Sequence, residues 1–196
     1  MHEPTPDLLA DVLGSVLQDS AFIFAEPVDE PEPFAAEVFA AELAFDSVRG
    51  GVLRLVTTPR GCVEIAANML GLDASEAEAQ DQARSALAEV LNVVGGAFVT
   101  RFFGTKVPSQ LGLPATQVLD RLTEKPHTCA TVLRLESGDQ VMLELDLEDP
   151  FDFSREVEFD RAPALRDLLH QVVAVNVDLF GFVGAHLEAD LFAGAV

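Results

Sequence analysis

Four residues near the middle of the chain have types and a spacing that could form a functional site. Ser85, Glu89, Asn92 and Gly96 recur every three or four residues, so in a helix they fall within roughly 60° of one another on one face. A carboxylate and a carboxamide then stand one turn apart beside small residues, and such a face could admit a second surface closely. Because a Glu and an Asn at this spacing are common on helix surfaces, the spacing alone is weak evidence of function.

The same segment carries an apolar stripe on its opposite side, as expected of a helix that packs against a core. The pattern predicts a helix over residues 76–103 that ends at Gly104. Two adjacent glycines lie inside this helix, which indicates close packing rather than a phosphate-binding loop. The residues of the stripe are Leu87, Leu91, Val94 and Phe98.

The composition disfavours several classes of function. The 196 residues include 33 acidic and 12 basic side chains, a net charge of −21 that repels phosphate backbones and anionic lipid. Nucleic-acid binding and membrane association are therefore not expected. No apolar stretch reaches the ~18 residues needed to span a bilayer, and the N-terminus lacks the basic start and apolar run of a signal peptide. We expect a cytoplasmic protein.

Other catalytic and metal-binding patterns are missing from the sequence. Cys62 and Cys129 lack the spacing of a disulfide framework or a zinc site, and we interpret them as buried free thiols. None of the 4 histidines has a Ser or Cys partner in a recognisable motif. Glycine-rich nucleotide loops and EF-hand spacings are also absent. We therefore expect no cofactor and no metal of the protein's own.

The remaining patterns predict helices and hairpin strands. Caps and glycine stops indicate where helices begin and end, and period-2 alternation indicates strands. Residues 37–45 fit a helix or a strand by periodicity alone, and the turn after them favours a strand. The expected elements are a helix over 7–18, a strand over 21–25, a loop over 26–33, a hairpin of strands 37–45 and 52–56, a helix from Thr58-Pro59 to Leu70 that stops at Gly71, a loop over 107–114 and a hairpin of strands 128–135 and 140–147.

The order of these elements predicts one α+β domain over residues 1–150. Its long helices would pack on one face of a mainly antiparallel sheet. Residues 151–196 are expected to form a C-terminal extension packed on the same domain. Within this extension residues 163–192 fit a helix by length and by their start, although valines at alternate positions near 173–177 also fit a strand.

The motif Ser85-x-x-x-Glu89-x-x-Asn92, with Pro114 after it, resembles the signature of the CheC/CheX/FliY phosphatases of bacterial chemotaxis. In that family an [Asp/Ser]-x-x-x-Glu-x-x-Asn helix is followed by a proline. Here the spacing from Asn92 to Pro114 is one residue shorter than is usual. The resemblance covers roughly residues 7–147 and is to CheX-like domains.

This resemblance implies a CheX/CheC-like fold and a phosphatase that removes the aspartyl phosphate of a CheY-like response regulator, in chemotaxis or two-component signalling. It implies that Asn92 orients the attacking water and that Glu89 pairs with a lysine of the partner. Ser85, Gly96 and Pro114 would contact the partner, and the Mg²⁺ is expected in the response regulator. The alternative is a non-catalytic CheX-like module that docks a response regulator or another signalling partner.

Within the family, the chain resembles the members that have a single site. Glu64 and Asn68 on the preceding helix are spaced i, i+4, which places them at different rotations and does not make a second site. Members of this form tend to be dimers with sheets joined edge to edge, so a homodimer is implied. Arg84 and Arg101 are expected towards the buried side of the motif helix, where neither would help an acidic partner to dock.

Overall fold

The structure is a computed structural model that describes residues 3–34, 36–122 and 127–148. The extension predicted over 151–196, with its helix, lies outside the described residues. In chain order the elements are α1 (Pro6–Ala21), β1 (Glu26–Pro27), β2 (Val38–Asp46), β3 (Gly51–Thr57), α2 (Pro59–Leu70), α3 (Ala77–Phe103), β4 (Gln110–Leu111), β5 (Ala115–Leu119), β6 (Cys129–Arg134) and β7 (Gln140–Leu147).

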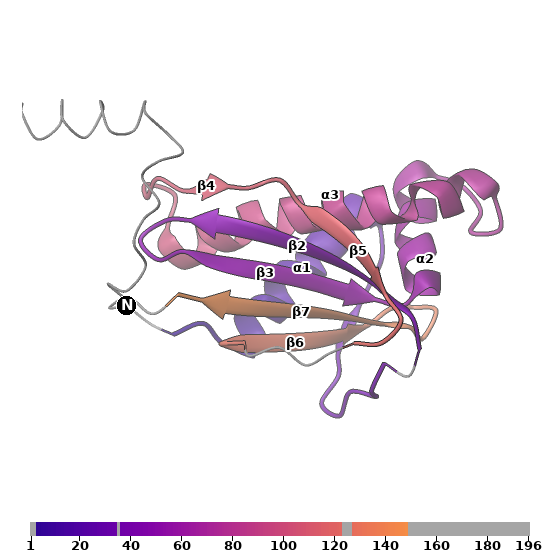
Figure 1. The fold of residues 1–196 in the computed structure, drawn as a ribbon, viewed down its shortest axis with the longest axis horizontal. Helices are drawn as coiled ribbons and strands as arrows, with labels where there is room; N and C mark the ends of the chain where they lie inside the picture. Colours follow the sequence, from indigo (N-terminus) through magenta and orange to yellow (C-terminus); the bar gives the residue numbers. More distant parts are fainter. Residues whose placement is uncertain (1–2, 35, 123–126, 149–196) are drawn as a thin grey trace, which may run out of the picture. The chain divides into compact units, whose positions relative to one another are not determined.

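The strands form one sheet, and the three helices cover one of its faces (Figure 1). In the described part of the chain the strand order is β1-β6-β7-β3-β2-β4, and β5 also pairs with β2. These strand pairs are all antiparallel. Helix α1 contacts β6, and α3 contacts β2 and both other helices. The predicted α+β class, with helices on one face of a mainly antiparallel sheet, is confirmed.

Both predicted hairpins are present, as β2–β3 and β6–β7. In β2 the alternate residues Ala41, Leu43 and Phe45 enter the main core together with the helices. Val38 and Ala40, which alternate with them, are buried in a separate small cluster. Because successive side chains of a strand point to opposite faces, this sheet has a large core on its helical face and a small apolar cluster on the other.

Helix α2 begins and ends where the sequence predicts. The Thr58 hydroxyl accepts a hydrogen bond from the Gly61 N–H at 3.0 Å, which caps the first turn. Pro59 occupies the first helical position, where its missing N–H costs nothing. At the other end Gly71 takes a left-handed φ of 68°, a conformation that glycine adopts without a Cβ clash.

Helix α3 runs through the middle of the core. The predicted stripe is confirmed, because the side chains of Leu87, Leu91, Val94 and Phe98 are all 0% exposed. By length and composition alone α3 could also cross a membrane, and the search for apolar runs in the sequence missed this. The core helices of water-soluble proteins meet the same criterion, and α3 packs against the sheet and the other helices.

The strand predicted over 21–25 is wrong. Helix α1 continues to Ala21, and Phe22 ends it in the left-handed region with a φ of 55°. The Phe22 N–H donates to the Gln18 carbonyl, which is the 5→1 bond of an αL cap, and the Ile23 N–H donates to the Leu17 carbonyl. The apolar run resembled a strand because Ile23 is buried just after the cap. The strand β1 falls instead at Glu26–Pro27, inside the predicted loop.

The loop predicted over 107–114 is only partly correct. It contains β4, and β5 follows it directly; both pair with β2 at the edge of the sheet. No residue of β4 or β5 is fully buried. An edge strand without a buried run lacks the alternation by which the other strands were predicted, so its sequence looks like that of a loop.

Helix α3 approaches the sheet most closely at Gly95. A Cβ placed on Gly95 would collide with Cδ2 of Leu43, a fully buried residue of β2. A Cβ on the next residue, Gly96, would meet only Cδ1 of Leu111 at 3.9 Å, an ordinary van der Waals contact. Close packing therefore explains Gly95, as the sequence indicated, but not Gly96.

The substitution Gly95→Ala should destabilise the domain. Alanine favours a helix over glycine by about 1 kcal/mol, but overpacking a core typically costs about 1–3 kcal/mol, and Leu43, which a Cβ at position 95 would meet, is fully buried. Gly96→Ala is the matched control and should leave stability equal or slightly higher. Urea unfolding of both variants measures the difference. Equal free energies of unfolding would contradict the close approach.

Cys62 lies where α2 packs against α3. Its side chain is fully buried, and its thiol donates to the Ala83 carbonyl at 3.0 Å. Burial raises the pKa of the Cys62 thiol to about 12, and the positive charge of Arg84 lowers it by less. Cys129 is also a buried free thiol, and burial raises its pKa as well. The interpretation of both cysteines as buried free thiols is confirmed.

The raised pKa of Cys62 predicts a loss of stability at alkaline pH. Above about pH 9 the unfolded chain releases this proton while the folded chain keeps it, so stability that is fully present below pH 9 falls as the pH rises towards 12. At about pH 10.5 the loss should be about 2 kcal/mol. Urea unfolding against pH measures it, and Cys62→Ala should show a smaller fall. The chain has no tyrosine, which simplifies the comparison; parallel pH curves would contradict the prediction.

Candidate functional site

Helix α3 presents the motif residues on its outer side. Ser85 and Glu89 are exposed, and Asn92 and Gly96 are half-buried. They lie opposite the buried stripe, so one amphipathic helix both anchors itself in the core and holds these groups in a fixed arrangement. Just before the helix begins, the Asp73 N–H donates a hydrogen bond to Oε1 of Glu76 at 2.8 Å. The site is thus carried by a rigid element rather than by a loop.

The side chains of Glu89 and Asn92 are not engaged elsewhere in the structure. Within residues 3–34, 36–122 and 127–148, neither makes a side-chain hydrogen bond or an ion pair. A carboxamide can donate two hydrogen bonds and accept two, and an ionised carboxylate only accepts. Asn92 can therefore hold a water molecule or a phosphate oxygen, and Glu89 can pair with a cation.

The strand register places Pro114 at the level of the motif along α3. Gly95 lies over Leu43 of β2. On the edge beside β2, Leu111 pairs with Phe45 and Ala115 pairs with Glu42, so residues 112–114 pass the same part of β2. The Gly112 N–H donates to the Ala44 carbonyl at 2.8 Å and holds this bend against the sheet. Pro114 and the C-terminal half of the motif therefore lie at the same position along the axis of α3, on adjacent elements.

Gly96 borders a small hollow between the end of α3 and the segment that leads to β4. The hollow has a volume of about 230 Å³ and is also lined by Val99, Thr100, Ser109 and Leu111. Because Gly96 has no side chain, nothing projects from the backbone of α3 at this point. A second protein surface can therefore approach the helix backbone closely beside Asn92.

The structure does not bring Glu64 and Asn68 of α2 into an arrangement like that of the motif. The Asn68 side-chain amide donates to the backbone carbonyl of Glu64 at 2.9 Å, so this amide is turned back onto its own helix. Ala67 stands where the motif spacing would require an asparagine, and it is buried. The expectation of a single motif on α3 thus agrees with the geometry of α2.

Arg84 and Arg101 are both exposed, although their rotation places them towards the buried side of α3, as expected. Long basic side chains can lie along an apolar surface while their charged ends reach water, which explains how Arg84 is exposed and still influences Cys62. Arg101 lies in the last turn of α3, where a positive charge complements the helix dipole. Both cations therefore lie on α3 outside the face that carries the motif residues.

The described residues contain no group of three or more His, Cys, Asp or Glu side chains that could hold a metal ion.

Comparison with solved structures places this architecture among known proteins. It is similar to the chemotaxis protein CheX of Desulfovibrio desulfuricans, with 18% identity, a TM-score of 0.55 and coverage of 72% of this chain and 97% of that one. A CheX–CheY–BeF₃–Mg²⁺ complex from Borrelia burgdorferi matches at 15% identity and a TM-score of 0.58, over 76% of this chain and 100% of that one. The chain has the CheX/CheC-like fold.

A CheC-like superfamily protein from Shewanella sp. PV-4 gives a comparable match, with 16% identity, a TM-score of 0.55 and coverage of 73% and 96% of the two chains. No family model matches the sequence, and no curated protein matches it. At these identities the similarity establishes the fold, and the functions of the neighbours remain theirs.

Sequence reasoning missed the apolar surface around the site. Leu113, next to Pro114, is 93% exposed, and Val93, next to Asn92, is 38% exposed. Single exposed apolar residues are normal on protein surfaces, and Leu113 is of interest because it adjoins Pro114, a predicted contact residue. The signal in the sequence was a leucine between Gly112 and Pro114, in a segment predicted to be a loop.

Proposed function

We propose that this protein is a phosphatase that removes the aspartyl phosphate of a CheY-like response regulator in the cytoplasm. The observation that carries the proposal is that Glu89 and Asn92 lie on the outer face of α3 with no side-chain partner among the described residues, in a chain with the CheX/CheC-like fold. The presence of CheY in the Borrelia burgdorferi complex supports a response regulator as the partner.

The proposed chemistry needs only a few functional groups from this chain. Phosphoryl transfer is catalysed mainly by positioning and by charge stabilisation, and the response regulator would supply the Mg²⁺ that stabilises the phosphate. The Asn92 carboxamide would accept from and donate to one water molecule and hold it in line with the phosphorus atom. Glu89 would accept a charge-assisted hydrogen bond from a lysine of the partner and fix the register of docking.

The surface around the two groups suits such docking. Ser85 and Gly96 are small, so the helix backbone can come close to a partner, and Pro114 lies at the same level on the neighbouring edge. The net charge of −21 gives no general attraction to an acidic response regulator. Recognition would therefore rest on short-range contacts. Pairing of two copies edge to edge remains a prediction from the resemblance.

Replacing Asn92 with alanine should abolish most of the phosphatase activity. Loss of one positioning or charge-stabilising donor typically lowers a rate by about 10²–10³-fold. Asn68→Ala is the matched control, because it removes the same side chain from α2, where the amide is bonded to the backbone, and its rate should be unchanged. The measurement is the decay of phosphorylated response regulators in the presence of each variant. Equal decay with wild type and Asn92→Ala would refute the catalytic role.

The same experiment separates the alternative function. If the protein binds a response regulator but its phosphate decays no faster than it does alone, the chain is a docking module that uses the same face of α3. Binding is measured with the BeF₃⁻-treated regulator, which mimics the phosphorylated form, and is compared with the decay rate in the same buffer.

Replacing Leu113 with glutamate should weaken docking without changing the chemical step. Burying a leucine contributes about 1.5–3 kcal/mol, so the affinity should fall by about 10-fold or more, while the decay rate at saturating protein is retained. Leu70→Glu is the matched control, since Leu70 is also an exposed leucine but lies at the end of α2. Equal affinities for both variants would show that Leu113 lies outside the docking surface.

A further inference from the structure

A second concave site lies apart from the motif, where the start of α2 meets the start of α3 and the β6–β7 turn. Its volume is about 790 Å³, within the range of small-molecule sites in proteins. Much of its wall is apolar and includes Phe39, Val63 and Ala74. Gln80 of α3 and Arg60 and Glu64 of α2 add polar groups. An apolar pocket with a few polar groups is typical of a site for an organic ligand rather than for a bare ion.

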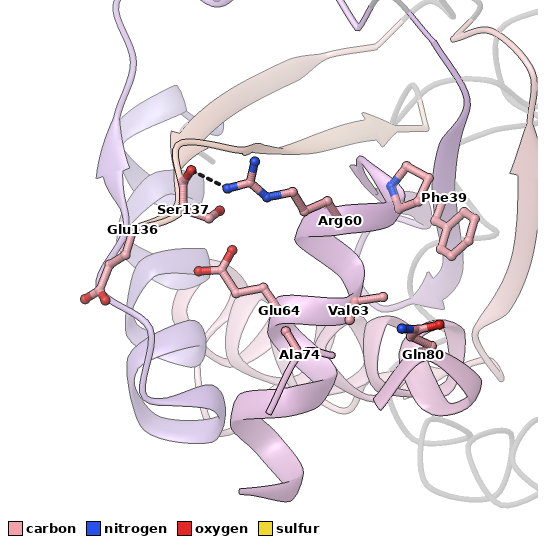
Figure 2. A pocket seen from close by; sticks show the side chains of 9 residues that line it. Phe39, Arg60, Val63, Glu64, Ala74, Gln80, Glu136 and Ser137 are labelled. Atoms are coloured by element: carbon pink, nitrogen blue, oxygen red, sulfur yellow. Dashed lines mark hydrogen bonds between the residues drawn. The ribbon is translucent and has the colours of Figure 1, made fainter. Parts of the chain in front are cut away.

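The positive charge in this pocket is already neutralised. Nε of Arg60 lies 3.1 Å from a carboxylate oxygen of Asp139, and its Nη2 donates to the Ser137 carbonyl at 2.9 Å. Figure 2 shows this second bond, which holds the guanidinium against the β6–β7 turn. Arg60 is therefore engaged by the β6–β7 turn, although its side chain is 72% exposed and an exposed ion pair is weak.

The negative charge of Glu64, in contrast, has no partner among the residues that the structure describes. Oε2 of Glu64 is buried and makes no hydrogen bond, and within the described residues the Glu64 carboxylate forms no ion pair. A buried carboxylate oxygen that lacks a donor is costly. Glu136 also lines the pocket, so the uncompensated charge there is negative. An incoming cation would satisfy Glu64 at this point.

The two kinds of wall lie on different sides of the pocket. In Figure 2 the carboxylate of Glu64 lies on the side of Ser137 and Glu136, and Phe39 and Val63 lie on the other. A ligand that fits this arrangement has a positively charged end and an apolar body. We propose that the pocket binds a small organic amine, with its ammonium group donating to Glu64 and its apolar part against Phe39 and Val63. This site is independent of the proposed phosphatase activity.

Phenethylamine is a suitable probe, because it combines an ammonium group with an aromatic ring, and 2-phenylethanol is its neutral counterpart. Titration of the isotope-labelled full chain, followed by NMR, should give a dissociation constant of about 1 mM or below for the amine, with shifts at Val63 and Gln80. The alcohol should bind at least about 10-fold more weakly, since it lacks the charge that pairs with Glu64. No shifts at about 10 mM amine, or equal binding of the alcohol, would overturn the proposal.

Two variants test the assignment of the pocket. Glu64→Gln should weaken amine binding by about 10-fold, because one charge-assisted hydrogen bond is lost. Ala74→Phe should also abolish binding by filling the space, and Ala74 is exposed, so folding should persist and is checked by the dispersion of the same spectra. Glu89→Gln makes the same change of charge on α3 and should leave amine binding unchanged. Unchanged binding in both pocket variants would refute the site.

Discussion

The contact between Gly95 of α3 and Leu43 of β2 is the constraint on which the other features depend. With no side chain at position 95, α3 lies close enough to the sheet for its apolar stripe to be fully buried. The rotation of the helix is then fixed, and the motif residues, which lie opposite the buried stripe, face outward. The edge formed by β4 and β5 pairs with the same strand, β2. This close contact thus sets both the distance of α3 from the sheet and the orientation of the candidate site.

Much of this arrangement could be predicted from the sequence, because the elements that form the site follow local rules. The stripe of α3, the caps of α2 and the alternation in the two hairpins each appear within a few residues. The errors fall where distant contacts decide the structure. Phe22 accepts a left-handed conformation because Ile23 is buried beyond it, and β5 is a strand because β2 leaves an edge open. The roles of Glu89 and Asn92 remain predictions, since structure shows their exposure and not their chemistry.

The second face of the sheet illustrates the same limit. Arg54 is only 4% exposed, and its Nη1 lies 2.9 Å from Oε2 of Glu144, with Oε1 of Glu42 3.5 Å from its Nε. These three residues are direct neighbours across β2, β3 and β7. In the sequence Arg54 interrupts an apolar strand without explanation, because its partners are far away in the chain. A paired charge in this position favours one register of the three strands, since a slip would leave it buried without a partner.

The candidate site contains few functional groups because, in the proposed function, the partner supplies the metal and the activated phosphate. A protein that must supply a nucleophile or a metal needs several converging groups, whereas one that orients a water molecule on a partner's activated phosphate needs a rigid helix, one carboxamide and one anchoring charge. Such a site needs no deep pocket to mark it. The specificity for a partner must then come from the shape of the surface around Glu89 and Asn92. In the proposal the exposed Leu113 beside Pro114 and the absence of a side chain at Gly96 provide that shape, in a protein whose overall charge would otherwise repel an acidic partner.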